Sequence, residues 1–315
     1  MKGSFAQVEE KEIVIGEEKR IFIRNLYGNT KLKTWNSHRL KLTITKHLTG
    51  DFSEQEAEKR LKHIELKEKE SEKGLSLEVS VPLFILTPDV KIGVDLDVFA
   101  PPYINLEIDT GLQKLNGSRK EGYINLSYKD KLLTKIQNVK GSLSILSGPA
   151  DIEIKNSEGK ISVESSSGRI TIKGFSGEMN VKNESGDIFL EECLGAIYVR
   201  NKSGNITLKG IEALLLSVKT SSGNIKADIN PIKEGAYDLE SYSGYIKLKL
   251  PFHSSCHVRL ETKCGKILSE PPFTLEGNEM RLGSGESSLA LKTSSGNIYV
   301  LHKLEEEKED GHTYR

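Results

Sequence analysis

Residues 159–213 read GKISVESSSGRITIKGFSGEMNVKNESGDIFLEECLGAIYVRNKSGNITLKGIEA. A small residue recurs at every ninth position of this stretch and of the residues just before it: Gly141, Ala150, Gly159, Gly168, Gly177, Gly186, Gly195, Gly204 and Ala213. After most of these positions, apolar residues stand two and four places on, with polar residues between them, as in Ile170 and Ile172. Such alternation indicates a strand, and a fixed short period indicates a repeat architecture.

Two nine-residue units make one coil of strand, corner, strand and corner. Glycine at a corner permits a positive φ, and the serine that usually precedes it, as in Ser167 and Ser203, can bond to the local backbone. One coil buries too few apolar side chains to fold alone, so several coils must stack. The sequence predicts an all-β fold, a parallel β-solenoid of about 18–21 residues per coil with two strands per coil, preceded by a β-rich region that carries one helix.

Outward residues provide an independent test of this register. In a parallel stack, residues one coil apart become neighbours about 4.8 Å apart. The predicted columns contain mostly alternating charges, which stabilise neighbouring strands. They bring together Lys173, Glu191, Lys209 and Asp228; Arg169 and Asp187; Lys160 and Glu178; and Glu164 and Lys182.

Composition excludes several classes of protein. The 45 basic residues equal the 45 acidic ones, so the basic footprint of a nucleic-acid-binding protein is missing. Three cysteines, an odd number, argue against a disulfide framework. No signal-peptide pattern is visible, and the longest apolar stretch, at 79–88, is too short to cross a bilayer. We expect a cytoplasmic protein without a transmembrane segment, for which peripheral association with the cell envelope stays open.

Three regions are expected along the chain. Residues 1–110 form strands and one helix at about 53–67, where Ser53 and Glu56 make a capping box; this region is a cap or the first coils. Residues 111–301 form the repeat solenoid, with a looped excursion in the wide gap at 266–295. Residues 302–315 form a charged tail, expected to be disordered.

One group of side chains suggests a zinc site. His253, Cys256, His257 and Cys264 are the right ligand types, but their spacing matches no standard pair of ligand motifs. Cys264 stands where serine precedes the corner glycine in other repeats, and Cys256 suits a packed apolar position. The repeats also lack the Gly-Gly and aspartate pattern of calcium-binding β-rolls. We therefore expect no metal and no cofactor.

No catalytic constellation is visible. Glu164 and Glu191 are interpreted as members of charged columns rather than as the carboxylates of a polysaccharide-cleaving enzyme, and the corner serines lack a histidine base. The Asn-x-Ser triplet at Asn183 and the Asn-x-Ser triplet at Asn201 are interpreted as turn composition, not as glycosylation sites. Outward aromatic residues are the candidate binding surface: Phe189, Tyr198, Tyr245 and Tyr299.

The repeats resemble those of the DUF4097 family of adhesin-like, β-strand repeat proteins. The resemblance is carried by SSGRITI (166–172), SGDIFL (185–190), SGNITL (203–208) and SSGNIKA (221–227), and by Tyr27-Gly28-Asn29 and VDLDVFAP (94–101) in the N-terminal region. It implies the solenoid fold and supplies no catalytic residues. Relatives are often tied to membrane segments or envelope-stress proteins.

These observations leave three hypotheses of function. The first is a non-catalytic β-solenoid that presents an extended surface to a protein or glycan partner. The second is a self-assembling cytoplasmic scaffold, similar in principle to bactofilins, because the end of a solenoid exposes unpaired strand edges. The third is an enzyme acting on polysaccharide.

Overall fold

The computed structural model describes residues 3–15, 20–72, 74–102, 104–111, 113–118, 123–126, 133–270 and 275–303. The chain divides into two compact units, Met1–Ile188 and Phe189–Arg315. Within the described ranges it is built from strands, one α-helix and one short 3-10 helix. The expected all-β, parallel β-solenoid fold is confirmed. The domain boundary expected at 110/111 stays a prediction.

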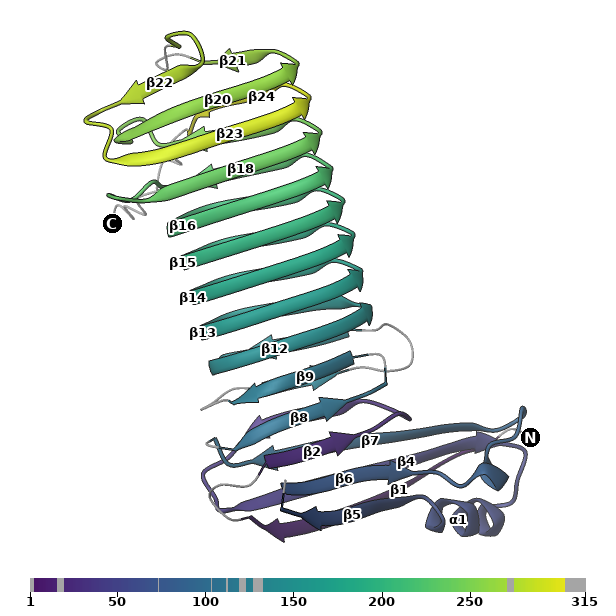
Figure 1. Ribbon diagram of the computed structural model, residues 1–315. Coiled ribbons are helices and arrows are strands. Elements are labelled where there is room, and N and C mark those ends of the chain that lie inside the picture. The colour runs from purple at the N-terminus through teal and green to yellow at the C-terminus, as the bar shows by residue number, and fades with distance from the viewer. Residues whose placement is uncertain are drawn as a thin grey trace, which may run out of the picture. The chain divides into compact units, whose positions relative to one another are not determined.

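The N-terminal part of the first unit contains two runs of paired strands, one in each layer (Figure 1). One layer runs β1–β4–β7–β3–β10–β11, and the other runs β5–β6–β2–β8–β9–β12. Several of these pairings are antiparallel. The strands are β1 (Gly3–Val14), β2 (Arg20–Arg24), β3 (Thr30–Thr34), β4 (Arg39–Gly50), β5 (Glu65–Ser71), β6 (Gly74–Ser80), β7 (Lys91–Ala100), β8 (Asn105–Asp109), β9 (Gln113–Ser118), β10 (Tyr123–Leu126), β11 (Leu133–Gln137) and β12 (Lys140–Pro149).

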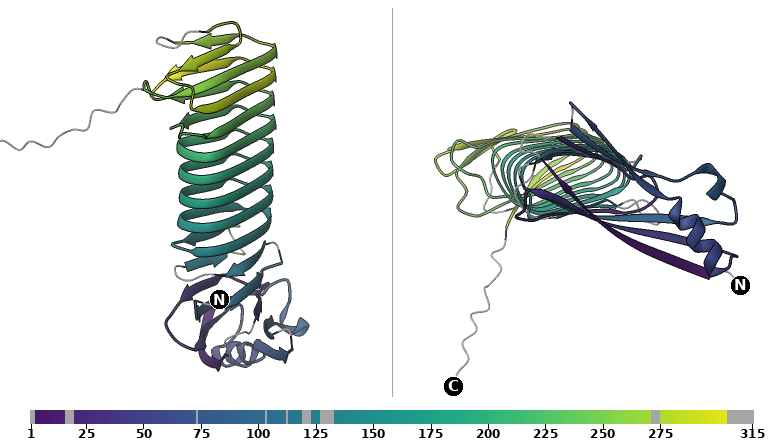
Figure 2. Two further views of the ribbon diagram at one scale, coloured as in Figure 1. Left: turned by 60° about the vertical axis from the view of Figure 1, so that its left-hand side comes forward. Right: turned by 90° about the horizontal axis from the view of Figure 1, so that it is seen from below.

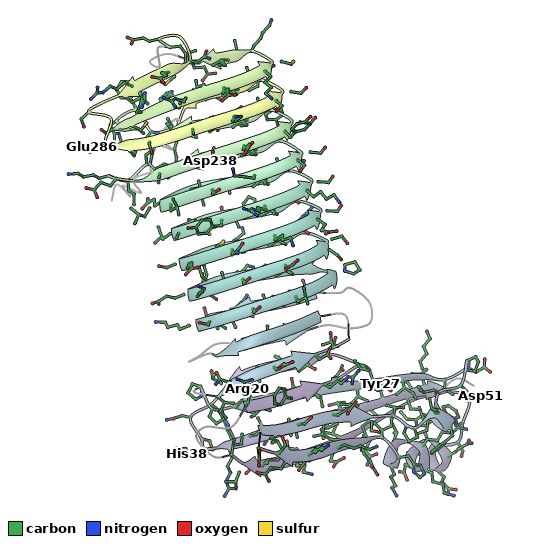
Figure 3. All side chains as sticks on the ribbon, viewed as in Figure 1. Arg20, Tyr27, His38, Asp51, Asp238 and Glu286 are labelled. Carbon is green, nitrogen blue, oxygen red and sulfur yellow. The ribbon has the colours of Figure 1, made fainter. Side chains whose placement is uncertain are left out.

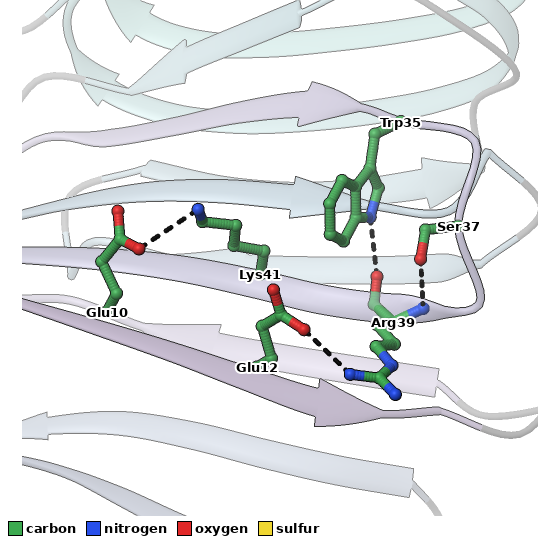
Figure 4. Close-up of polar contacts among 6 residues, drawn as sticks. All are labelled: Glu10, Glu12, Trp35, Ser37, Arg39 and Lys41. Atoms are coloured by element: carbon green, nitrogen blue, oxygen red, sulfur yellow. Dashed lines mark hydrogen bonds and ion pairs between the residues drawn. The ribbon is translucent and has the colours of Figure 1, made fainter.

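Ion pairs on the surface match the register of β1 and β4 (Figure 4). Arg39 lies 3.1 Å from Glu12, and Lys41 lies 3.2 Å from Glu10. Just before β4, the indole of Trp35 donates a hydrogen bond of 2.7 Å to the carbonyl of Arg39. The ion pairs therefore join β1 to β4, and the Trp35 hydrogen bond closes the turn between β3 and β4.

The helix α1 (Glu54–Lys62) begins where the capping box predicts but ends earlier than expected. The Ser53 hydroxyl accepts the backbone N–H of Glu56 at 3.3 Å. The expected end at 67 is wrong, because β5 begins at Glu65 and pairs with β6. Backbone pairing with a neighbouring strand therefore replaces the last turn of the predicted helix. A 3-10 turn, η1 (Leu83–Ile85), follows β6.

The regular coils of the first unit have the predicted register. β13 (Asp151–Ser167) and β14 (Ile170–Ser185) pair in parallel, with Ile152 opposite Ile170 and Gly159 opposite Gly177. Two predicted charge pairs form across them: Lys160–Glu178 at 2.9 Å and Glu164–Lys182 at 2.6 Å. The eighteen-residue coil is therefore confirmed here.

Corner glycines are required by both conformation and space. Gly177 has a φ of +133°, and a Cβ there would lie 2.0 Å from the carbonyl oxygen of Gly159 in the neighbouring coil. The backbone carbonyls of corner glycines also accept hydrogen bonds from a row of buried polar side chains that stand before the corners. The sequence analysis did not predict this row. Asn183 donates to the carbonyl of Gly168 at 3.1 Å, and in the second unit Ser241 donates to that of Gly223 at 2.9 Å. Polar side chains of the interior therefore gather beside the corner, where these carbonyls accept their hydrogen bonds.

The second unit also has two layers (Figures 1 and 2). β16, β18, β23 and β20 form one layer, and the first part of β16 with β17, β19, β24 and β21 forms the other. The strands are β15 (Ile188–Ser203), β16 (Ile206–Ser222), β17 (Ile225–Ile229), β18 (Ala236–Ser243), β19 (Ile246–Leu250), β20 (Cys256–Cys264), β21 (Ile267–Ser269), β22 (Glu279–Leu282), β23 (Ser287–Ser295) and β24 (Ile298–His302).

The coils of the second unit are not stacked in sequence order. β23 and β24 insert between the coil of β18 and β19 and the coil of β20 and β21. A Cβ on Gly296 would accordingly meet the carbonyl of Gly244, and one on Gly265 would meet that of Gly296. The excursion expected at 266–295 is not a loop throughout: this segment contains β21, β22 and β23, and β23 inserts between β18 and β20. β22 pairs antiparallel with the start of β20.

Candidate binding face of the second unit

The four residues of the suggested zinc cluster do not come together. Cys256 and Cys264 are the two ends of β20, roughly 26 Å apart at the rise of a strand. Cys256 is buried, and burial raises the pKa of its thiol to about 12. Cys264 is exposed and lies opposite Ser295, which precedes a corner glycine. Across the part of the chain that the structure describes, no group of three or more His, Cys, Asp or Glu side chains is placed to hold a metal ion.

His257 has a structural partner instead. Its Nε2 lies 3.2 Å from a carboxylate oxygen of Glu279, and the Nε of Arg259 donates to the other oxygen at 3.1 Å. Arg259 first, and then His257, holds the pKa of Glu279 below its ordinary value. Because Glu279 belongs to β22 whereas His257 and Arg259 belong to β20, these contacts fasten β22 onto the outermost coil.

Two of the four predicted aromatic residues meet. The rings of Tyr245 and Tyr299 contact edge to face, with centroids 6.1 Å apart. Asn297 donates to the Tyr299 hydroxyl at 2.9 Å. Tyr299 lies beside Lys247 in the register of β19 and β24, on the outward side of that sheet. Tyr245 and Tyr299 thus form a contacting aromatic pair on that side.

The other two aromatic residues do not join them. Phe189 is half-buried and follows Ile188 in β15, at the repeat position that Tyr299 occupies after Ile298. Tyr198 is 39% exposed and lies in the second half of β15. The equivalent half of β16 pairs with β18, so by its repeat position Tyr198 belongs to the opposite layer.

A groove of about 1270 Å³ lies on the sheet face that carries Tyr299. Its floor comes from outward positions that neighbour one another in the register of β17, β19 and β24, such as Asp228, Lys249 and Leu301. Residues 251–255, which follow β19, form one side. We call this surface, from the tyrosine pair to residues 251–255, the outer groove.

A tight turn places an exposed aromatic ring at the side of the outer groove. Pro251 ends β19, and its carbonyl accepts the backbone N–H of Ser254 at 3.2 Å and the Ser254 hydroxyl at 2.8 Å. Phe252 and His253 are the central residues of this turn. The Phe252 side chain is 64% exposed, and its ring contacts His302 edge to face at 6.3 Å. The turn therefore presents an aromatic platform next to the polar floor.

Several polar side chains of the outer groove form ion pairs or hydrogen bonds with one another. Lys209 lies 3.1 Å from Glu191, as the predicted column requires, and Lys303 lies 3.0 Å from Asp228. Asn230 donates to Glu212 at 3.0 Å. Lys173, the other predicted member of the column, belongs to the first unit. The groove thus offers carboxylate, ammonium and amide groups side by side.

Glu192, which lines the outer groove, has a strained backbone. Its φ is +52°, in the left-handed region that costs a non-glycine residue roughly 1–2 kcal/mol. The same repeat position is glycine at Gly174 and Gly210, with φ of +62° and +61°. Asn156 occupies this position in the first unit, with a φ of +48°.

The opposite layer has a smaller and flatter depression, about 570 Å³ in volume. Its floor is formed by short side chains, including Ala236, Ser288 and Ala290. Beside it, Asp238 lies 3.2 Å from Lys219 (Figure 3). It contains no exposed aromatic ring among its lining residues, and so it is the weaker candidate.

Sequence reasoning missed most of the outer groove. Phe252, His302 and Asn230 lie outside the regular repeat, where no periodicity identifies outward positions. The available signal was the interruption itself, because Pro251 closes a strand and an exposed phenylalanine follows it. The tyrosine pair was predicted residue by residue but not as a pair, since β24 inserts next to β19.

Comparison with known proteins gives a family and no close relative. A family model described as Toastrack DUF4097 matches residues 18–301. No curated protein matches the sequence.

Solved structures show only a weak likeness. A "putative cell adhesion protein" from Clostridium sporogenes is 14% identical, with 94% of this chain and 100% of that chain covered and a TM-score of 0.25. A "putative adhesin" from Bacteroides fragilis is 10% identical, with 94% and 97% covered and a TM-score of 0.30. One from Parabacteroides distasonis is 9% identical, with 94% and 97% covered and a TM-score of 0.28. At these values the fold rests on the strand pairing and not on the superpositions.

Proposed function

This chain belongs to the Toastrack DUF4097 family over residues 18–301, and on that premise we propose that it is a non-catalytic binding protein whose outer groove holds a glycan. The observation that carries the proposal is the ring of Phe252, exposed at the side of a groove lined by paired polar groups. The flat face of an aromatic ring suits the apolar face of a sugar, and carboxylate, amide and ammonium groups suit its hydroxyls.

A binding role is favoured over glycoside hydrolysis by the partners of the acids. Hydrolysis needs two carboxyl groups flanking one bond, of which one stays protonated to act as the acid. In the outer groove Glu191 and Asp228 each face a lysine, and Glu212 accepts a hydrogen bond from an amide. Such contacts favour ligand-binding carboxylates over a proton donor.

The scaffold hypothesis is less favoured because the outermost coil of the second unit carries a cap. β22 pairs with residues 256–259 of β20, and Glu279 fastens it there. An edge covered in this way is a poor template for the next chain. Light scattering over a concentration series tests this; filaments that grow with concentration would favour the scaffold.

An array of neutral, amino and acidic oligosaccharides tests the proposal. We expect the wild-type chain to bind one class and Phe252→Ala to raise the Kd about 30-fold, since truncating an aromatic anchor costs about 2 kcal/mol. Tyr198→Ala is the matched control, because it also removes an exposed ring. The repeat position of Tyr198 assigns that ring to the opposite layer. Absence of binding by the wild type, or equal losses in both variants, would contradict the proposal.

A further inference from the structure

The first unit carries a group of exposed apolar side chains that takes no part in the outer groove. Residues 82–88 read PLFILTP, and η1 lies within them. Leu83 is 85% exposed, Phe84 64% and Leu86 43%, whereas Ile85 between them is fully buried. Ile85 therefore anchors the turn in the core, and the other three side chains project from it. We call residues 83–86 the apolar tip.

Local hydrogen bonds hold part of the backbone of the apolar tip in a fixed turn. The N–H of Ile85 donates to the carbonyl of Pro82, that of Leu86 to Leu83 and that of Thr87 to Ile85, at 3.0–3.1 Å. A prolyl residue on each side removes further N–H groups and restrains φ. Polar backbone groups with internal partners can leave water at little penalty. The tip is thus a preformed apolar projection.

The basic end of α1 lies beside the tip. The ring of His63, the C-cap of α1, contacts the Phe84 ring edge to face at 5.2 Å. The last turn of α1 is basic and its first turn, at the far end, is acidic. Some exposed charged residues lie near the tip in the sequence, and others lie near His63, whose ring contacts Phe84. They are Lys59, Lys62, Lys91, Glu65 and Asp89. Lysines next to projecting apolar groups are placed to meet lipid phosphates while the apolar groups enter the acyl region.

From this geometry we propose that the apolar tip inserts into the surface of a lipid bilayer, with Lys59 and Lys62 at the headgroups. The attachment is peripheral: no helix of the described ranges is long and apolar enough to span a membrane. A small convex tip of three side chains can enter a fluid bilayer without a complementary pocket, whereas a protein partner would need one. The inference is independent of glycan binding, since the tip and the outer groove belong to different units.

Co-sedimentation with phosphatidylcholine vesicles, with and without phosphatidylserine, tests the proposal. We expect the wild-type chain to sediment with the vesicles, more strongly when phosphatidylserine is present. The double variant Leu83→Ser/Phe84→Ser should lose at least tenfold in partitioning. Val8→Ser/Val14→Ser is the matched control, since it removes exposed apolar side chains elsewhere and should bind like the wild type. All four positions are exposed, so unchanged circular dichroism is expected.

Fluorescence reports insertion directly. Trp35 is the single tryptophan, so Phe84→Trp in a Trp35→Phe background gives one probe at the tip. Its emission should shift to the blue with vesicles and be quenched by brominated lipid, whereas Val14→Trp in the same background should show neither effect. No wild-type sedimentation, equal sedimentation of the tip variant, or unshifted emission from the Phe84→Trp variant would overturn the proposal. A tip-dependent dimer formed without vesicles would overturn it in favour of contact between copies.

Discussion

Replacing a corner glycine should break the stack where it stands. Gly177→Ala would place a Cβ 2.0 Å from the carbonyl oxygen of Gly159, so the two coils must separate by more than 1 Å, on the order of the shortfall from ordinary contact. The positive φ of +133° adds strain of roughly 1–3 kcal/mol. Together with weakened ladder hydrogen bonds at roughly 1 kcal/mol each, we expect a loss of about 4 kcal/mol or more.

The control separates the two causes. Gly277 also has a positive φ, +65°, but a Cβ there meets nothing within 4 Å. Gly277→Ala should therefore cost only the conformational strain, about 1 kcal/mol.

The assay must be local, because repeat proteins lose stability coil by coil. Hydrogen exchange followed by mass spectrometry should show peptides from β13 and β14 exchanging about a thousandfold faster in Gly177→Ala, the equivalent of about 4 kcal/mol. Gly277→Ala should leave these peptides unchanged. Wild-type protection of β13 and β14 in Gly177→Ala would refute the close stacking of the coils.

Three further predictions concern charged residues of the second unit. Glu192→Gly should stabilise the unit by about 1 kcal/mol in urea unfolding, because the left-handed φ no longer strains a side chain, and should weaken glycan binding on the array. Glu191→Lys should destabilise it by roughly 0.5–1 kcal/mol at low salt and less at high salt, because a like charge then faces Lys209; equal stability at low salt would contradict the column. The lowered pKa of Glu279 predicts that β22 is fastened at neutral pH and loosens as pH falls through that lowered pKa. Relative to the intrinsic exchange rate at each pH, the amides of residues 279–282 should lose protection in acid, and Glu279→Gln should abolish that dependence.

The register of the regular coils was predictable because its period is strict. Once the corners are fixed at every ninth residue, alternation decides which side chains point inward, and the columns follow. The pairs Lys160–Glu178 and Lys209–Glu191 form as their spacing requires. The early end of α1 was not predictable from helical periodicity, because backbone pairing of β5 with β6 decides it.

The order of the last coils could not be read from the sequence. Gly244 is followed by Gly265 at the spacing of one coil, and the segment that begins at Gly296 has the same local pattern. Both segments resemble the partner that the coil of β18 and β19 needs, since β20 and β23 each offer two inward aliphatic residues at matching positions. The choice depends on strand pairings between distant segments and on β22, which pairs with β20. The tyrosine pair depends on that choice, and so it too was out of reach.

The coil limits where binding chemistry can arise. Inward positions must pack, and corner positions serve the stack: the side chain after a corner often accepts the backbone N–H of the next coil, as Asn205 accepts that of Asn224 at 3.1 Å. The polar side chains before the corner also serve the stack, as the buried Asn183 does by donating a hydrogen bond to the carbonyl of Gly168. Only outward positions and interruptions of the repeat can vary freely. The outer groove combines both, since its floor is outward and its side is the turn at Pro251. Under the proposed function, changes at the turn that follows Pro251 would therefore alter the glycan that binds while the stack is preserved.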